Sequence, residues 1–257
     1  MDEILENEDY RERTRLLIGM GGIKRLQRAR VVVLGLGGVG SYALEALARA
    51  GVGEFWLIDG DDIELSNLNR QLLALRSTLG CAKVEAARDR VADINPGAVV
   101  RCEKMRYAAE SPRDFSGWDY VVDAIDDIGA KVVLASACLK ARTPLIAAMG
   151  AGRRLEAGAF RVCDVSRSSG DPLARRYRRL LRGQGITEGI KVVVSPDPPL
   201  SQVREEAGKI ETGQEQRDPK QGERRGQKEQ GPVGSVSFVP AVVGLLMAGE
   251  VVRDLLV

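Results

Sequence analysis

Residues 30–40 read RVVVLGLGGVG, and this stretch decides the fold. The apolar, β-branched run at 30–34 is typical of a buried parallel strand. Glycines follow at the point where the strand gives way to a predicted helix at 41–50, which Gly51 ends. Such a turn lets backbone amides and the positive end of a helix dipole approach a phosphate. The glycines predicted to lie at the phosphates are Gly35, Gly37, Gly38 and Gly40.

Further strands and helices alternate along the next hundred residues. Strands are predicted at 55–58, 99–102, 120–124 and 145–149, and helices at 83–94 and 131–140. Asn95-Pro96 stops the first of these helices. This alternation predicts an α/β fold, a Rossmann-like open and mostly parallel sheet with helices on both faces. Ligands bind such sheets at the carboxyl ends of the strands.

Three regions are predicted along the chain. They are an N-terminal helical segment at 1–28, an ATP-binding Rossmann-like domain at 29–152, and a smaller C-terminal region at 153–257 for substrate binding and dimerisation. The last region contains predicted strands at 159–163 and 191–195, a helix at 172–182 and a C-terminal helix. Between them, 201–231 is rich in Gln, Glu, Lys, Arg and Gly, a composition that predicts a mobile loop.

The composition excludes several classes of protein. The 257 residues include 38 basic and 36 acidic side chains, so no polyelectrolyte partner follows from the net charge of +2. There is no histidine, which excludes a histidine base or ligand. Four dispersed cysteines without a CxxC pair argue against a zinc knuckle or disulfide framework and suggest a cytoplasmic location. No signal peptide is evident, and the apolar C-terminus is too interrupted to predict membrane insertion.

Polar residues after the glycine turn indicate which nucleotide binds. A glycine turn followed by Asp59, which can bind ribose hydroxyls, would alone favour a nicotinamide-dependent oxidoreductase. Asn67, Arg70 and Lys83 add donors for a triphosphate, and Asp126 can bind Mg²⁺. Cationic groups on phosphates stabilise charge that develops in a transition state. The set fits attack of a carboxylate on the α-phosphate of ATP, giving an acyl-adenylate and pyrophosphate.

The string GLGGVGSYALEALARAGVGEFWLIDGDDIELSNLNRQ at 35–71 resembles the ATP site of the ubiquitin-activating-enzyme-like superfamily, which includes the MoeB, ThiF and HesA adenylating enzymes. The resemblance implies ATP and Mg²⁺ as cofactors, with Asp126 at the metal. It also implies a homodimer in which Arg13 reaches the partner's site, so that Arg13, Arg70, Lys83 and Asp126 are the candidate catalytic residues. The candidate nucleotide-binding residues are Gly35, Gly37, Gly38, Gly40, Asp59, Asp61, Ser66, Asn67, Arg70, Gln71, Lys83, Asp126 and Asp127.

Four other segments resemble one family within this superfamily, the tRNA threonylcarbamoyladenosine dehydratases. They are VDAID at 122–126, MGAG at 149–152, DPLAR at 171–175 and GSVSFVP at 234–240. The resemblance implies adenylation of the carboxylate of threonylcarbamoyladenosine at position 37 of tRNA, followed by cyclisation with loss of AMP. The absence of two CxxC pairs separates the chain from sulfur-carrier activators of the MoeB and ThiF type.

Basic side chains in the C-terminal region are candidate contacts for tRNA phosphates, although a solvated basic helix face explains the helical ones equally well. These residues are Arg153, Arg154, Arg175, Arg176 and Arg179. The sequence also leaves open whether a sulfur-relay protein docks on the chain.

Three alternative functions remain open on the sequence. One is activation of the C-terminal glycine of a ubiquitin-like sulfur carrier, with Cys163 or Cys81 as acceptor. Cys163 lies in an apolar strand, which favours a core position. The others are a nicotinamide-dependent oxidoreductase and a non-catalytic nucleotide-sensing scaffold.

Overall fold

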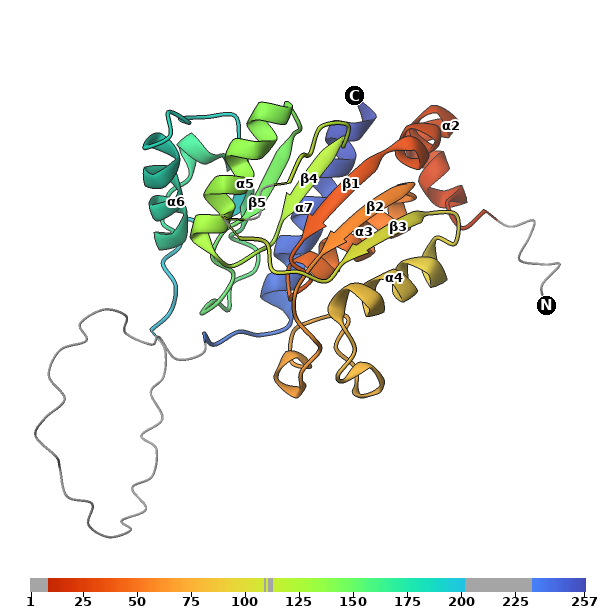
Figure 1. Cartoon of the computed structure of the whole chain (residues 1–257), viewed down its shortest axis with the longest axis horizontal. Coiled ribbons are helices and arrows are strands. Elements are labelled where there is room, and N and C mark those ends of the chain that lie inside the picture. The colour runs from red at the N-terminus through yellow and green to blue at the C-terminus, as the bar shows by residue number, and fades with distance from the viewer. Residues whose placement is uncertain (1–8, 109, 111–112, 202–232) are drawn as a thin grey trace, which may run out of the picture.

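A computed structural model describes residues 9–108, 110, 113–201 and 233–257 (Figure 1). The loop predicted at 201–231 therefore lies, apart from Ser201, outside the described residues.

A seven-stranded sheet forms the centre of the molecule. The strands run in the order β3-β2-β1-β4-β5-β7-β6, and only β6 is antiparallel to its neighbour. This confirms the predicted open, mostly parallel α/β sheet. The strand bounds are β1 Arg30–Leu34, β2 Glu54–Ile58, β3 Val99–Glu103, β4 Tyr120–Asp123, β5 Leu145–Ala148, β6 Arg161–Asp164 and β7 Lys191–Val194.

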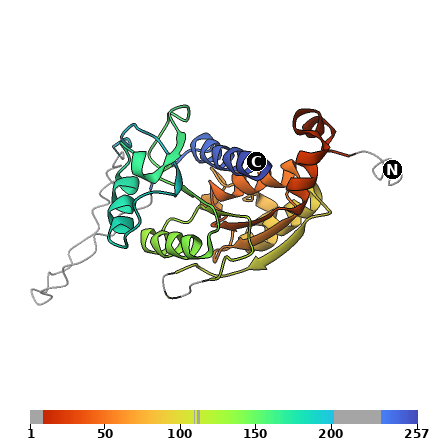
Figure 2. The same cartoon turned by 90° about the horizontal axis from the view of Figure 1, so that it is seen from above.

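Helices cover both faces of the sheet (Figures 1 and 2). One apolar core joins α3, α4 and α7 to the sheet, and a second joins α5 and α6 to its other face. The long helix α2 packs against α7 at one end of the molecule. The helix bounds are α2 Glu12–Arg28, α3 Gly40–Ala50, α4 Lys83–Ile94, α5 Ile128–Ala141, α6 Pro172–Arg182 and α7 Phe238–Leu256.

The first βαβ unit shows why the local sequence folds as predicted. Residues 31–34 of β1 are completely buried, as their apolar, β-branched character requires. Gly51 ends α3 with a φ of 91°, a left-handed conformation that glycine adopts without steric cost. Three short 3-10 turns, at Leu65–Asn67, Arg76–Thr78 and Val165–Arg167, lie outside the predicted elements.

The C-terminal region shares the sheet of the preceding residues. Strand β7 pairs with β5, and α7 makes its most extensive contacts with α3. A Cβ atom at Gly244 would lie only 2.3 Å from the carbonyl oxygen of Val39, so this glycine permits the close approach of the two helices. No helix in the described part of the chain is long and apolar enough to cross a membrane.

The backbone of Arg153 brings together two segments that are far apart in the sequence. Its N–H donates to the Gly234 carbonyl (2.8 Å), and its carbonyl accepts from the Leu200 N–H (2.7 Å). The described chain on either side of 202–232 is thereby held at one point on the molecule.

Candidate nucleotide site

The predicted nucleotide-binding residues lie at the carboxyl ends of β1, β2 and β4. Strand β1 has β2 on one side and β4 on the other, so the direction of strand addition reverses at β1. A crevice at such a switch point is the usual ligand site of an open α/β sheet.

The glycine turn is packed too tightly for side chains at two of its positions. Gly35 has a φ of 83°, and a Cβ there would lie 2.6 Å from the Ala124 carbonyl oxygen. A Cβ at Gly40 would lie 1.7 Å from the Gly35 carbonyl oxygen. Gly37 differs, because the nearest atom to a Cβ there is 3.9 Å away. Open space at Gly37, beside the first turn of α3, suits an approaching phosphate.

Asp59 fastens the glycine turn to the end of β2. Its carboxylate accepts the Leu36 N–H at Oδ2 (2.6 Å) and the Asp61 N–H at Oδ1 (2.8 Å). The carboxylate is almost completely buried. Each carboxylate oxygen has a second acceptor site, so these bonds leave capacity for a ribose hydroxyl.

Lys83 is buried at the start of α4, beside two of the predicted acidic residues. Its Nζ donates to Asp61 Oδ2 at 2.8 Å and lies 4.0 Å from Asp59 Oδ1. The hydrogen bond from Lys83 lowers the pKa of Asp61, with a smaller contribution from Arg106. The ammonium group therefore sits at the carboxyl end of β2, where the resemblance places a contact with the triphosphate.

The cassette at 66–71 folds into a compact turn. Asn67 is buried, and its Oδ1 accepts the Glu64 N–H (3.1 Å), which closes the 3-10 turn. Arg70 lies beside the glycine turn, with its Cγ 3.4 Å from a Cβ built on Gly38. Within the described ranges, its guanidinium donates only to the Ser66 carbonyl (3.0 Å) and Asn69 Oδ1 (2.8 Å). Among the described residues Arg70 forms no ion pair, so its charge is available to an anion.

Gln71 is the buried end of this cassette. Its Oε1 has no hydrogen-bond partner within the described ranges, and its Nε2 faces Gly37. A buried amide oxygen can accept hydrogen bonds, so Gln71 Oε1 is an acceptor that a bound nucleotide could use beside Gly37.

Asp126 and Asp127 follow β4 and are both exposed. Asp127 accepts the Ala130 N–H at 2.7 Å and so caps α5. Asp126 has no hydrogen bond or ion pair in the described structure. No three His, Cys, Asp or Glu side chains converge into a metal cage in the part of the chain that the structure describes. One free carboxylate suits Mg²⁺, which is often held by one or two carboxylates together with substrate phosphates.

Sequence reasoning missed two polar features of this site. Ser41 Oγ donates to the Gly37 carbonyl (2.6 Å) and accepts the Leu72 N–H (3.3 Å), which joins the glycine turn to the 66–71 cassette. Asp123 and Lys131 form a buried ion pair of 2.9 Å beneath the Asp126 turn. Burial raises the pKa of Asp123, and the Lys131 ammonium opposes that rise. The available signal was a lysine at the first position of a mostly apolar predicted helix, eight residues after Asp123.

The basic candidates for tRNA contact fall into two groups. Arg153, Arg175, Arg176 and Arg179 are exposed and form no ion pair in the described structure. Arg154 is buried, and its guanidinium bonds to Asp171, Gly150 and Asp197. The Arg154 donors are therefore engaged inside the protein, so the predicted contact of Arg154 with tRNA has no support from this geometry and stays a prediction.

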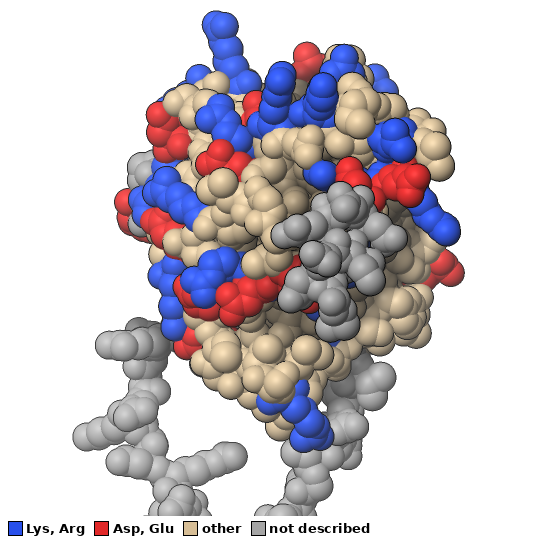
Figure 3. All heavy atoms as spheres, turned by 90° about the vertical axis from the view of Figure 1, so that its right-hand side faces the viewer, with Lys and Arg blue, Asp and Glu red and all other residues tan. Residues whose placement is uncertain are grey.

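Arg13 is exposed on α2, which bends at Gly19. Gly19 has φ 69° and ψ 172°, so the turns before and after it point in different directions. The first turns also expose apolar side chains, with Leu16 80% and Leu17 84% exposed. Basic and acidic side chains are interspersed on the visible part of the face around α2, β3 and α4 (Figure 3).

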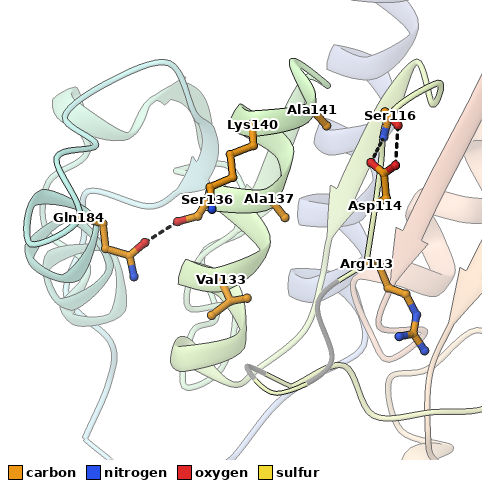
Figure 4. A pocket seen from close by; sticks show the side chains of 9 residues that line it. All are labelled: Arg113, Asp114, Ser116, Val133, Ser136, Ala137, Lys140, Ala141 and Gln184. Atoms are coloured by element: carbon orange, nitrogen blue, oxygen red, sulfur yellow. Dashed lines mark hydrogen bonds between the residues drawn. The ribbon is translucent and has the colours of Figure 1, made fainter.

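A cavity of about 650 Å³ lies beside α5 (Figure 4). Its lining includes Arg113, Ser136, Lys140 and Gln184, and none of the predicted nucleotide-binding residues. The nucleotide candidates are thus gathered by the glycine turn and the strand ends, apart from this cavity.

Comparison with known proteins gives a consistent set of similarities. A sequence profile of the ThiF family matches residues 10–256. A curated tRNA threonylcarbamoyladenosine dehydratase of Bacillus subtilis is 44% identical over 95% of this chain and 93% of its own length. The crystal structure of the Escherichia coli enzyme TcdA in complex with ATP superposes with a TM-score of 0.78, at 28% identity, over 94% of this chain and 91% of that one. The adenylyltransferase and sulfurtransferase MOCS3 of Drosophila yakuba is 35% identical, but over only 55% of this chain and 32% of its own length.

Proposed function

The chain belongs to the ThiF family and, within it, to the tRNA threonylcarbamoyladenosine dehydratases, and from this membership we propose that it adenylates the carboxylate of threonylcarbamoyladenosine at tRNA position 37. The modified base then cyclises, releasing AMP. The observation that carries the proposal is the convergence of the glycine turn, Lys83 and Arg70 in a chain that is 44% identical to such an enzyme over nearly its whole length.

Each nucleotide-binding candidate has a role in this proposal. The amides of the 35–40 turn and the start of α3 hold phosphates. Asp59 binds the ribose with the acceptor sites that Leu36 and Asp61 leave free. Arg70 and Lys83 stabilise negative charge as the substrate carboxylate attacks the α-phosphate and pyrophosphate departs.

Asp126 would hold Mg²⁺ in this enzyme. Its exposed, unpaired carboxylate is an oxygen ligand of the kind that Mg²⁺ prefers. The bound ion supplies positive charge to the phosphate oxygens. Asp127 has less freedom, because one of its oxygens already caps α5.

The chemistry needs neither a histidine nor a nucleophilic cysteine. After adenylation the substrate supplies its own nucleophile, so the enzyme's task is to position the carboxylate and stabilise the leaving group. Burial raises the pKa of the Cys163 thiol, so a smaller fraction of this side chain is the nucleophilic thiolate that an acceptor role would need. Cys163 also packs against the second core, in line with the prediction of a core position.

The exposed arginines of α6 are the proposed contact for tRNA phosphates. Asp171 caps α6, and the apolar face of α6 packs on α5 through Tyr177 and Leu181. The buried face leaves Arg175, Arg176 and Arg179 directed to solvent. Their charges are free to release counterions from a nucleic acid backbone. A tRNA substrate and four free cysteines support a cytoplasmic location as part of the proposal.

The proposed homodimer places Arg13 in the partner's site. Arg11, two residues before it, packs against Gly51, which precedes β2. Arg13 thus lies near the amino ends of the strands, whereas the nucleotide residues lie at their carboxyl ends. A five-residue strand spans roughly 16 Å, so Arg13 is well removed from the site of its own chain. That separation, and the exposed Leu16 and Leu17, support a contribution across a subunit interface.

The decisive experiment is mass spectrometry of tRNA nucleosides incubated with the enzyme and ATP. We expect loss of one water from threonylcarbamoyladenosine, with AMP and pyrophosphate in equal amounts. The alternative function is activation of a ubiquitin-like sulfur carrier, for which the MOCS3 similarity over half of the chain is the supporting observation. Adenylation of a Gly-Gly-tailed protein, with the tRNA left unchanged, would favour that alternative. A role for a sulfur-relay protein would appear as a faster rate when that protein is added.

A further inference from the structure

We infer that the buried pair Asp123–Lys131 positions Asp126, and thereby sets the affinity of the site for Mg²⁺ without touching nucleotide or metal. The inference rests on the proposed function, in which Asp126 holds the metal. Neither residue of the pair is among the nucleotide-binding candidates.

The pair is enclosed completely by the protein. The side chains of Asp123 and Lys131 are 0% and 1% exposed. Lys131 Nζ donates to Asp123 Oδ1 at 2.9 Å and lies 3.5 Å from the Asp123 carbonyl oxygen. Asp123 Oδ1 also accepts the Ile125 N–H at 3.2 Å. The carboxylate therefore binds both the helix α5 and the backbone of the turn that follows β4.

Lys131 holds the other end of the same turn through its backbone. Its N–H donates to the Asp127 carbonyl at 3.0 Å, while the Asp127 side chain accepts the Ala130 N–H. One lysine is thus bonded to the residues on both sides of Asp126, by its side chain before it and by its main chain after it. Asp126 is exposed between two fixed points.

The turn is also in contact with the glycine turn. The Ala124 N–H donates to the Leu34 carbonyl at 2.8 Å, and the Ala124 carbonyl occupies the space beside Gly35. A shift of 124–126 would therefore move Asp126 relative to the phosphates. Substitution of a group that holds a metal ligand in place typically weakens metal affinity or activity by roughly 10–100-fold.

Stability alone does not account for a buried ion pair. The cost of removing two charges from water offsets their attraction, and apolar residues of similar volume are often equally stable. Asp123 Oδ2 has no hydrogen-bond partner in the described part of the chain, which adds to that cost. A requirement for fixed geometry at Asp126 supplies the missing reason for the pair.

The test replaces both charges at once. Lys131→Met alone leaves a buried carboxylate unpaired and is expected to destabilise the fold, so the informative variant is Asp123→Leu/Lys131→Met. We expect it to melt cooperatively, to bind ATP normally without Mg²⁺, and to need about tenfold or more Mg²⁺ for half-maximal enhancement of ATP binding in calorimetry. Asp123→Asn is a second, milder variant, and we expect a smaller increase in its Mg²⁺ requirement for ATP binding.

The control is Arg154→Met/Asp171→Asn, which removes an equally buried ion pair from another part of the same sheet edge. Its Mg²⁺ requirement for ATP binding should match the wild type. A wild-type Mg²⁺ requirement in folded Asp123→Leu/Lys131→Met, or in Asp123→Asn if the double variant does not fold, would overturn the inference. Asp126→Ala is measured in parallel. If Asp126→Ala also has a wild-type Mg²⁺ requirement, Asp126 does not hold the metal. If Asp126→Ala needs more Mg²⁺ and the variants of the pair do not, only the positioning role of Asp123 and Lys131 is contradicted.

Discussion

Arg154 donates from Nη2 to Asp171 Oδ2 at 2.8 Å, and this ion pair is buried at the start of α6. The same guanidinium donates to the carbonyls of Gly150 (2.9 Å) and Asp197 (2.5 Å). One arginine therefore joins the end of β5, the first turn of α6 and the segment after β7. The helix that carries the exposed arginines is fixed to the sheet through this contact.

Arg154→Ala should lower the free energy of unfolding by about 3–5 kcal/mol, because Asp171 would keep a buried, unpaired charge. Urea denaturation measures the change. The neighbouring exposed Arg153→Ala is the control and should alter stability by no more than about 0.5 kcal/mol. Equal, small effects of the two substitutions would contradict the structural role of Arg154.

The combined variant Arg175→Ala/Arg176→Ala/Arg179→Ala should weaken tRNA binding and reduce its dependence on salt. The slope of log affinity against log salt is negative, and each lost phosphate contact reduces its magnitude by about 0.7–0.9. Binding of ATP should not change. Arg28→Ala/Arg49→Ala/Arg88→Ala removes three exposed cations from α2, α3 and α4 and is the control for net charge. If both variants weaken tRNA binding to the same degree, α6 is not a specific contact surface.

Arg70→Ala and Asp126→Ala should each reduce the rate of adenylation by about a hundredfold or more, since each removes a group that acts on the phosphates. Thermal melting should be close to the wild type, because neither side chain is buried. Pyrophosphate release measures the rate. Arg76→Ala, which lies on an adjacent exposed turn, should retain the wild-type rate. Normal turnover in both Arg70→Ala and Asp126→Ala would place the active site elsewhere.

Arg13→Ala should also be defective, but its defect should be complemented by a different subunit. In a mixed dimer of Arg13→Ala and Arg70→Ala chains, one of the two sites receives Arg13 from the Arg70→Ala subunit and Arg70 from the other. Subunit exchange followed by the pyrophosphate assay should recover part of the activity. Exchanged dimers without any recovery would argue against a shared site.

Gly19→Ala should move the Arg13-bearing turns of α2. Gly19 adopts a conformation that is accessible almost only to glycine, so alanine there costs about 1–3 kcal/mol or changes the backbone. A Cβ at Gly19 meets no atom within 4 Å, and the same is true of Gly21. Gly21→Ala is therefore a matched control and should stabilise the helix by up to about 1 kcal/mol. A loss of activity confined to Gly19→Ala, with ATP binding intact, is the expected result. Equal activities would mean that the bend does not direct Arg13.

The sheet and its first βαβ unit could be predicted because their signals are local. Residues 30–34 form an apolar run, and the glycines mark the turn. Asn95-Pro96 ends a helix through local steric effects that do not depend on the tertiary structure. Two features of the fold were less accessible from the sequence. The antiparallel direction of β6 depends on its pairing with β7, and the 3-10 turns are set by single hydrogen bonds such as that of Asn67.

Burial of charged residues could not be predicted from single positions. Arg153 and Arg154 are adjacent and identical in type, yet only Arg154 points inward, because Arg153 has a φ of 56° at a bend in the chain. Lys131 and Asp123 meet only when α5 packs on β4. A lysine in the first turn of a mostly apolar helix, eight positions after an acid at a strand end, is a sequence pattern that predicts such a pair.

The two backbone hydrogen bonds of Arg153 have a practical consequence. Because Leu200 and Gly234 both bond to the backbone of Arg153, the two ends of the interval between them lie close together on the sheet. The free energy of joining two such ends by a chain segment changes only slowly with the length of the segment. The interval is therefore a natural place to insert a fluorescent reporter or an affinity tag, and the protein can be labelled there while both of its termini stay unmodified.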